Sequence, residues 1–405
     1  MNRRTKLMVV LSSTFLVAVL LLGTVLGRSA SPDGPYRHLA VYTEVLSRIK
    51  SEYVEEPDLK SVTLGALNGL LESIDPFASY LNSDQYKEYQ KNRGTLKGEV
   101  GLVLAKRYGY IGIVTAVPGS PGARAGLTTG DMLESIRGVA TRDMPLAYAD
   151  LLLHGVPGTT VEISVLRIRR PEPQKLTLTR ALLTDPPVAA KMLPNQIGYI
   201  RPETLVPANN IRPEALVPSK VKQVAAAIAD LEKKGASSLI LDLRHNAVGD
   251  PEQGVALADL FLDKGKITYL QGQRHARKDF DADPASVWNK KLVVIVNRGT
   301  AGAAEVASAG LLANKRAELV GERSYGDAAV RRAVGMEDGG AIILSVAKYY
   351  TPEGKAIQDT GVTPPNLVNE PEPRVESEEE EAPAPEPAKP EEDILLKKAI
   401  EIASK

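Results

Sequence analysis

Hydrophobic positions are unevenly distributed along this chain of 405 residues, and the longest apolar run comes first. Residues 7–27 are 21 positions without a charge, and residues 1–6 before them include three basic side chains. A run of this length spans a hydrocarbon core as a helix, with its basic end in the cytoplasm. It predicts an inner-membrane anchor and a periplasmic or extracytoplasmic location for the bulk of the chain. A cleaved signal peptide is the alternative, which the length of the run disfavours.

Apolar residues at helical spacing follow in residues 28–95. One stripe consists of Tyr42, Val45, Leu46, Ile49 and Tyr53, and a second of Leu64, Leu67, Leu70 and Leu71. Both stripes match the period of an amphipathic helix. The residue before a proline disfavours helical torsions, so the second helix is expected to end at Asp75, before Pro76. The region is therefore predicted to be helical.

Residues 181–369 alternate apolar strands with helical segments, which is typical of an α/β core. The predicted strands are 197–201, 238–244 and 292–296, and the predicted helices are 221–234 and a helix beginning near Ala303. Gly235 follows the first of these helices, where a glycine commonly ends a helix. We therefore expect a largely buried sheet covered by helices.

The end of the chain differs in composition from the rest. Residues 370–392 contain ten Glu and six Pro against one Arg and one Lys, which predicts a disordered acidic linker. Residues 393–405 after it have the period of a short amphipathic helix with an acidic start. Such a helix is expected to dock on this chain's own N-terminal region or on a second copy.

Composition excludes several classes of function. Lys and Arg number 50 and Asp and Glu number 50, so no basic excess predicts nucleic-acid binding. The chain has no Cys, and its four His residues lack ligand spacing, so neither a metal site nor a cofactor is expected.

Two glycine-containing motifs lie within residues 96–180. The first is Gly98-Glu99-Val100-Gly101-Leu102-Val103-Leu104, and the second extends from Ser120 to Gly138. Together they resemble a PDZ domain, in which backbone N–H groups bind the terminal carboxylate of a peptide that adds as a strand. This resemblance implies a helix at residues 147–153 beside that strand. The peptide-binding residues it implies are Gly101, Leu102, Val103 and Leu104.

A strand, a turn of small residues and a helix occupy residues 292–305, with Gly299-Thr300-Ala301-Gly302-Ala303-Ala304-Glu305 at the turn. This segment resembles the nucleophile turn of the carboxyl-terminal processing (tail-specific) serine peptidases. The resemblance extends in order from residue 37 to residue 368 and to the last helix. It implies an α/β peptidase core of the ClpP/crotonase type with an inserted PDZ domain, and an N-terminal region that contributes to dimer contacts.

The resemblance fails at the residues that carry the chemistry. Family members have a nucleophilic Ser in the turn and a general-base Lys 25 residues later, and those positions are Gly302 and Asp327 here. Arg331 replaces a family Gln. No catalytic residue is therefore expected. The family's oxyanion hole would use the backbone N–H groups of Gly249 and Ala303, although Val248 replaces a family Gly beside them.

These patterns leave three functions open. The first is a non-catalytic relative that binds protein or peptide C-terminal tails, as a homodimer or paired with an active relative. The second is a serine-type endopeptidase that processes C-termini with a displaced catalytic group, for which the nearby candidates are Thr300, Ser308, Ser324 and Lys315. Thr300 is otherwise expected to help cap the helix. The third is a scaffold that works through dimer contacts alone.

Overall fold

A computed structural model describes residues 35–92, 97–107, 109–142, 144–167, 172–206, 219–284, 286–370 and 392–405. The predicted basic end and anchor, residues 1–6 and 7–27, lie outside these residues, as does almost all of the predicted acidic linker. Within the described ranges, no helix combines the length and the apolar character needed to cross a bilayer. The prediction of an inner-membrane location through a single N-terminal helix is corrected by this finding, because none of the helices that the structure describes could span a membrane.

The chain divides into two compact units, residues 1–66 and residues 67–405. Helix α2 (Pro35–Glu52) belongs to the first unit, and α3 (Leu59–Ile74) begins in the first and ends in the second. Both helices occur where the apolar stripes predict them. On α2, Val45 is exposed, while Leu46 and Ile49 are half-buried.

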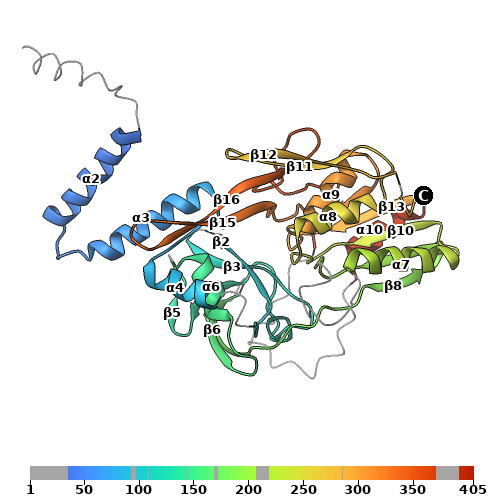
Figure 1. The fold of residues 1–405 in the computed structure, drawn as a ribbon. Helices are drawn as coiled ribbons and strands as arrows, with labels where there is room; N and C mark the ends of the chain where they lie inside the picture. The colour runs from blue at the N-terminus through green and yellow to red at the C-terminus, as the bar shows by residue number, and fades with distance from the viewer. Residues whose placement is uncertain are drawn as a thin grey trace, which may run out of the picture. The chain divides into compact units, whose positions relative to one another are not determined.

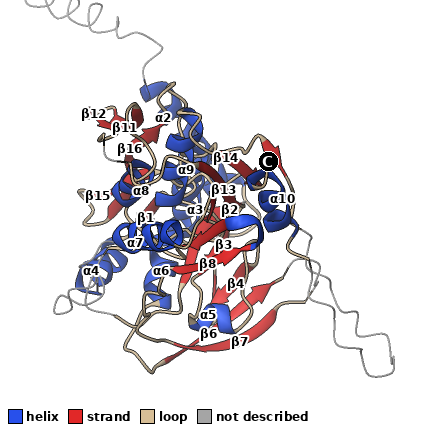
Figure 2. Cartoon of the chain, turned by 90° about the vertical axis from the view of Figure 1, so that its right-hand side faces the viewer, coloured by secondary structure: helices blue, strands red, loops and turns tan. Residues whose placement is uncertain are grey.

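The second unit contains a sheet that corresponds to the predicted PDZ domain (Figure 2). Its strands follow the order β2-β3-β4-β6-β7, and β5 (Val139–Ala140) pairs with β4. Their bounds are β2 (Leu102–Arg107), β3 (Tyr110–Ala116), β4 (Met132–Ile136), β6 (Thr160–Leu166) and β7 (Gln174–Thr179). Helices α5 (Pro121–Arg124) and α6 (Leu146–Leu153) accompany them. Strand β2 is at an edge of this sheet, which matters for the peptide-binding prediction.

A six-stranded sheet forms the α/β core, in the order β17-β14-β13-β10-β9-β8. Figure 1 labels its strands β13, β10 and β8. Its strands are β8 (Ala189–Leu193), β9 (Ile197–Arg201), β10 (Ser238–Asp242), β13 (Lys291–Val296), β14 (Glu318–Gly321) and β17 (Asn366–Leu367). Only β8 is antiparallel to its neighbour. The short 3₁₀ helix η1 (Pro194–Gln196) connects β8 to β9.

Helices cover both faces of the middle of this sheet, which is why the central strands β10 and β13 are buried along almost their whole length. Leu292, Val294 and Val296 of β13 belong to the buried cluster that includes residues of α7 (Lys220–Lys233), α8 (Pro251–Asp259) and α9 (Ala303–Ala313). Val293 and Ile295 face the opposite cluster, which includes Leu395 and Ala399 of α10 (Ile394–Ala403). The alternation of adjacent residues between two cores follows from the two-residue period of a strand.

A third sheet combines distant segments of the second unit. It contains β1 (Ser79–Leu81), β16 (Ala341–Tyr350), β11 (Lys266–Gly272) and β12 (His275–Asp281), and β15 (Ala329–Gly335) pairs with β16. Helix α4 (Ser83–Asn92) follows β1. Strand β1 thereby fixes the segment after α3 to the strands that follow Asp327.

Candidate functional site

The turn between β13 and α9 is held by buried hydrogen bonds. Asn297 Oδ1 accepts from the N–H groups of Gly299 and His245, at 3.1 and 3.0 Å. The Thr300 hydroxyl accepts from Asn297 N at 3.0 Å and donates to Leu243 O at 2.8 Å. Thr300 is fully buried. It therefore holds the turn in place. The prediction that it helps cap α9 is wrong, because Gly302 is the N-cap residue and the Thr300 hydroxyl bonds to the residues directly after β10 and β13.

Gly302 is the N-cap residue of α9 and has a left-handed φ of 62° with ψ −123°. A side chain in this region of torsion space is strained, and glycine removes that strain. A Cβ added at Gly302 would have two neighbours within 4 Å, Asp327 O at 3.7 Å and Ala247 O at 4.0 Å. The position thus has space for a serine side chain, but it holds no functional group.

Glu305, in the first turn of α9, connects the two vacated positions. Its carboxylate accepts from the N–H of Gly302 at 3.2 Å and from those of Gly326 and Asp327 at 2.7 Å each, and the Ser324 hydroxyl also donates to it. Glu305 is fully buried. Burial raises its pKa to about 7, and the bond from Ser324 opposes that rise. The sequence contained this acid at the end of the turn motif, but its partners lie too far along the chain to be read from spacing.

Asp327 forms an ion pair with Arg331, four residues later. The Arg331 guanidinium lies over the ring of Phe77, with its carbon 4.0 Å from the ring centroid. Burial raises the pKa of Asp327, and the charge of Arg331 opposes this. A carboxylate with its own cation therefore occupies the position where the family has a basic amine.

The other candidate catalytic groups near the turn form hydrogen bonds within the fold or are exposed to solvent. Ser308 is buried within α9, and its hydroxyl donates to Ala304 O at 2.7 Å. The Ser324 hydroxyl accepts from Val362 N at 2.7 Å while it donates to Glu305. Lys315 is exposed. Hydroxyls committed in this way cannot easily attack a peptide carbonyl, because attack would break buried bonds.

The predicted oxyanion loop lies directly after β10. Gly249 packs so closely on Leu205 that an added Cβ would be 2.2 Å from Leu205 O. Val248 O accepts from Leu205 N at 2.7 Å, and Val248 does not have a positive φ. His245 takes the left-handed torsion in this loop, with φ 58°. The loop therefore accommodates Val248 without the strain that the sequence suggested.

Ala303, the second predicted oxyanion residue, begins α9 and is 1% exposed. Among the described residues no acceptor binds its N–H, as expected for the first residue of a helix. The oxyanion role of Gly249 and Ala303 remains a prediction. The atom of this loop within 4.0 Å of a Cβ built at Gly302 is the carbonyl oxygen of Ala247.

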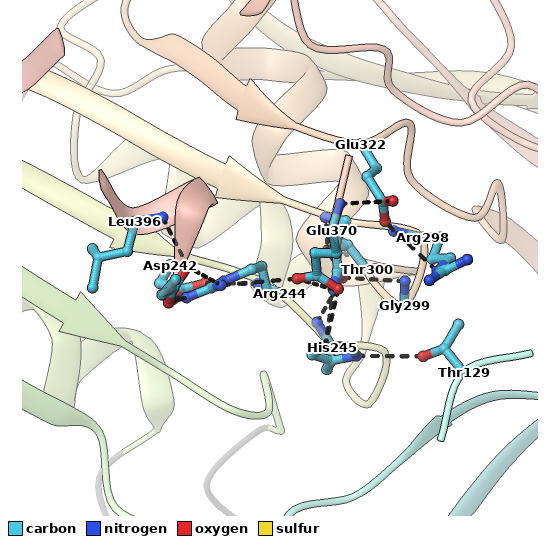
Figure 3. A network of polar contacts seen from close by, with 12 residues as sticks. Thr129, Asp242, Arg244, His245, Arg298, Gly299, Thr300, Glu322, Glu370 and Leu396 are labelled. Atoms are coloured by element: carbon cyan, nitrogen blue, oxygen red, sulfur yellow. Dashed lines mark hydrogen bonds and ion pairs between the residues drawn. The ribbon is translucent and has the colours of Figure 1, made fainter. Parts of the chain in front are cut away.

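A polar network joins this loop to other parts of the second unit (Figure 3). Arg244 pairs with Asp242 at 2.7 Å, with Asp393 at the start of α10 at 2.8 Å, and with Glu370 at 3.8 Å. Arg244 thus fastens α10 to the end of β10, directly before the predicted oxyanion loop.

His245 extends the same network to the loop between α5 and β4 of the PDZ region, where its Nδ1 lies 3.3 Å from the Thr129 hydroxyl (Figure 3). Its Nε2 lies 2.9 Å from Asn297 Nδ2, an amide nitrogen that can only donate, so Nε2 accepts this hydrogen bond; the two N–H groups that donate to Asn297 Oδ1 fix which amide atom is the nitrogen. Burial, with the charges of Arg201 and Arg244, lowers the pKa of His245 to about 4. The ring is therefore neutral at physiological pH.

The predicted peptide-binding residues lie at the start of β2. Gly101 O accepts from Val117 N at 2.8 Å, and Leu102, Val103 and Leu104 pair with β3. Because β2 is an edge strand, alternate backbone groups face away from β3. Helix α6 appears where the PDZ resemblance predicts a helix. Among the described residues no group of three or more potential ligands could hold a metal ion.

Comparisons with known proteins match this architecture. A sequence model of peptidase family S41 matches residues 196–367, and a PDZ domain model matches residues 112–167. The carboxyl-terminal-processing protease of Synechocystis sp. is 33% identical over 332 residues, covering 80% of this chain and 75% of that protein. The carboxy-terminal processing protease CtpA of Bacillus subtilis is 30% identical over 375 residues, covering 90% of this chain and 77% of that protein.

Among solved structures, the photosystem II D1 C-terminal processing protease is similar, with a TM-score of 0.64 and 27% identity, covering 80% of this chain and 86% of that chain. The extent of these matches, over both the PDZ sheet and the α/β core, shows that this chain belongs to peptidase family S41, together with the carboxyl-terminal processing proteases, and contains a PDZ domain.

Proposed function

We propose that this chain binds the C-terminal tails of proteins or peptides and does not cut them. The observation that carries the proposal is Gly302, which stands at the head of α9 with space for a side chain and none present. Peptide hydrolysis by a serine peptidase of this family requires a nucleophile at position 302 and a general base near it. Here the base position is Asp327, whose carboxylate pairs with Arg331.

The nearby hydroxyls support the same conclusion. Thr300, Ser308 and Ser324 are all buried, and each donates a hydrogen bond to a group of the fold. A nucleophile must instead be free to approach the carbonyl carbon and must have a base within hydrogen-bond reach. None of these three meets both conditions.

The tail-binding part of the proposal rests on β2. An edge strand that begins at a glycine-containing loop presents N–H groups to a terminal carboxylate and a strand edge to the residues before it. Gly101, Leu102, Val103 and Leu104 supply these features here. Neither a homodimer nor pairing with an active relative is needed for this binding.

The test uses the purified full chain and two measurements. Binding of peptides with a free C-terminal carboxylate is compared with that of the same peptides ending in an amide, and we expect the amide to bind markedly more weakly. Unfolded reporter proteins with varied tails are then incubated with the chain and examined for cleavage, and we expect none. Equal binding of both peptide forms would refute tail recognition, and cleavage would refute the non-cutting role.

The competing function is serine-type endopeptidase activity, favoured by the names of the relatives, which are processing proteases. It requires a displaced nucleophile. Cleavage that disappears in Thr300→Ala or Ser308→Ala would establish it, provided that the variant remains folded by circular dichroism.

A further inference from the structure

Strand β12 is an edge of the third sheet. The strand order there is β1-β16-β11-β12, so β12 pairs with β11 alone among the described strands. Figure 1 shows β12 beyond β11, on the side away from β16. All residues of β12 are exposed except Phe280, which is half-buried. Backbone N–H and C=O groups of alternate residues therefore face outward along this edge, where a further strand could bind them.

The charges of β12 are ordered by sign. Arg277 and Lys278 come first, and Asp279 and Asp281 follow. Proteins usually protect an exposed edge with prolines, short strands or repelling charges. No proline lies within the seven residues of β12. Charges of a single sign would repel a second copy of this strand, whereas two separated signs attract it, because antiparallel pairing reverses one of the two strands.

Contacts within the chain hold these side chains on the two faces of β12. On one face, Arg277 Nε lies 2.9 Å from Asp279 Oδ1, and its guanidinium carbon lies 3.7 Å from the ring centroid of Tyr269 in β11. On the other face, Lys278 Nζ lies 2.6 Å from Glu252 Oε1. Side chains that are already ordered lose less conformational entropy when a partner binds.

We propose that β12 pairs antiparallel with β12 of a second copy of this chain and joins the two sheets into one. A two-fold axis perpendicular to the joined sheet places one residue of β12 opposite itself. With Lys278 on the axis, Arg277 of each copy lies opposite Asp279 of the other. With Asp279 on the axis, Arg277 lies opposite Asp281. Both registers thus form two cross-strand pairs of opposite charge, which stabilise adjacent strands.

Like charges meet only at the axis, and each of them has a partner in its own copy. Lys278 has Glu252, and Asp279 has both Arg277 and Lys266, whose Nζ lies 2.9 Å away. The interface uses none of the residues proposed to bind tails, since β2 belongs to a different sheet. Two short strands bury less surface than a standard interface of about 1,600 Å², so we expect reversible association that weakens as salt is added.

The first test exchanges the charges of the edge in the full chain. Arg277→Asp makes the edge acidic, and Asp279→Arg with Asp281→Arg makes it basic. In either register each variant alone places like charges opposite each other, so we expect its self-association to weaken roughly tenfold or more in sedimentation velocity. A mixture of the two places opposite charges together and should associate at least as tightly as the original chain. Lys233→Asp, with the same change of charge on an exposed residue of α7, is the matched control and should have no effect.

The second test locates the contact by cross-linking. The chain has no Cys, so a single introduced Cys can form a disulfide only with a second copy. Under mild oxidation, Lys278→Cys or Asp279→Cys, whichever residue lies on the axis, should cross-link much faster than Lys233→Cys. Self-association that persists in both charge variants, or that does not recover on mixing them, would overturn the pairing and place any dimer on another face. A chain that stays monomeric, or cross-linking no faster than in Lys233→Cys at either position, would overturn it as well.

Discussion

The turn around Gly302 and the edge of β2 use their polar groups in opposite ways. At the turn, the carboxylate of Glu305 takes the amides of Gly302 and Asp327, and the nearby hydroxyls bond to the fold. At β2, the outward backbone groups of Leu102 and Leu104 have no partner among the described residues. Groups that are satisfied internally stabilise a structure, whereas groups left open can bind a ligand.

This difference shows that the fold of a peptidase can be kept when its catalytic groups are absent. A strand, a turn and a helix surround Gly302 in the order that the sequence predicts, and the buried hydrogen bonds of Thr300 and Glu305 hold them together. Fold and activity are thus distinct properties of the same segment. If the comparison is correct, changes at the turn alter stability or create activity, and they leave tail binding at β2 unchanged.

The largest expected effect comes from restoring the catalytic groups. We predict that Gly302→Ser, Asp327→Lys and Arg331→Gln together give cleavage of an unfolded reporter at least roughly a hundredfold above the original chain. The third change is needed because Arg331 would otherwise face the new Lys and its like charge. The matched control carries Gly302→Ala with the same two other changes and should remain inactive.

Activity in that control would show that a group outside the turn performs the chemistry. Inactivity of the serine variant, with folding and tail binding intact, would show that the oxyanion loop is also unsuitable. In that second case the orientation of the Ala247 carbonyl toward Gly302 would be the first feature to change.

The next largest effect is on stability. Glu305→Ala leaves four donors, three of them backbone amides, without their acceptor in a buried site. We expect a loss of about 3–5 kcal/mol in the free energy of unfolding, measured by urea denaturation. Glu305→Gln keeps the size and one acceptor oxygen, so its loss should be clearly smaller. Equal and small losses, below about 1 kcal/mol, would contradict the role given to this carboxylate.

Local sequence patterns predicted the helices and strands that carry the turn around Gly302 and the edge of β2. The features that these patterns did not predict depend on contacts between residues far apart in the chain. The apolar run before Asn297 and the small residues after it were sufficient to predict β13, the turn and α9. The role of Thr300 was predicted wrongly, because its acceptor, Leu243 O, lies 57 residues earlier.

The hydrogen bond from Lys106 N, in β2, to Pro76 O was equally hidden from the sequence. It joins two backbone groups, and backbone groups leave no mark in the residue types. Asp327 and Arg331 were both noted as departures from the family, but nothing in their spacing indicated that the pair would lie against Phe77. The sequence was therefore enough to name the candidate site residues. The residues that each of them contacts could be found only in the folded structure.

A moderate effect is expected from the torsion at Gly302. Replacing this glycine with alanine places a Cβ at φ 62°, so we expect a loss of about 1–3 kcal/mol in the free energy of unfolding. Gly335→Ala is the matched control, since Gly335 lies in β15, has no close neighbours and lacks a positive φ. Urea denaturation of both variants tests this. Equal changes in stability would mean that the turn is not strained, and a loss of tail binding only in Gly302→Ala would mean that the two regions are coupled.

The smallest effect tests that coupling through His245, which touches Thr129 on the PDZ side and Asn297 at the turn. Its pKa in the folded chain is lowered to about 4, so the unfolded chain binds the proton more readily. The contribution of His245 to stability is therefore present above about pH 6.5, the ordinary value, and is lost as the pH falls toward 4. We expect His245→Gln to lose less stability than the original chain between pH 7 and pH 4.5, with the difference measured by urea denaturation at each pH. Parallel pH profiles would show that the ring does not lie in the buried, positively charged environment that lowers its pKa. A variant that also binds tails more weakly at pH 7 would show that the turn and the edge of β2 are not independent.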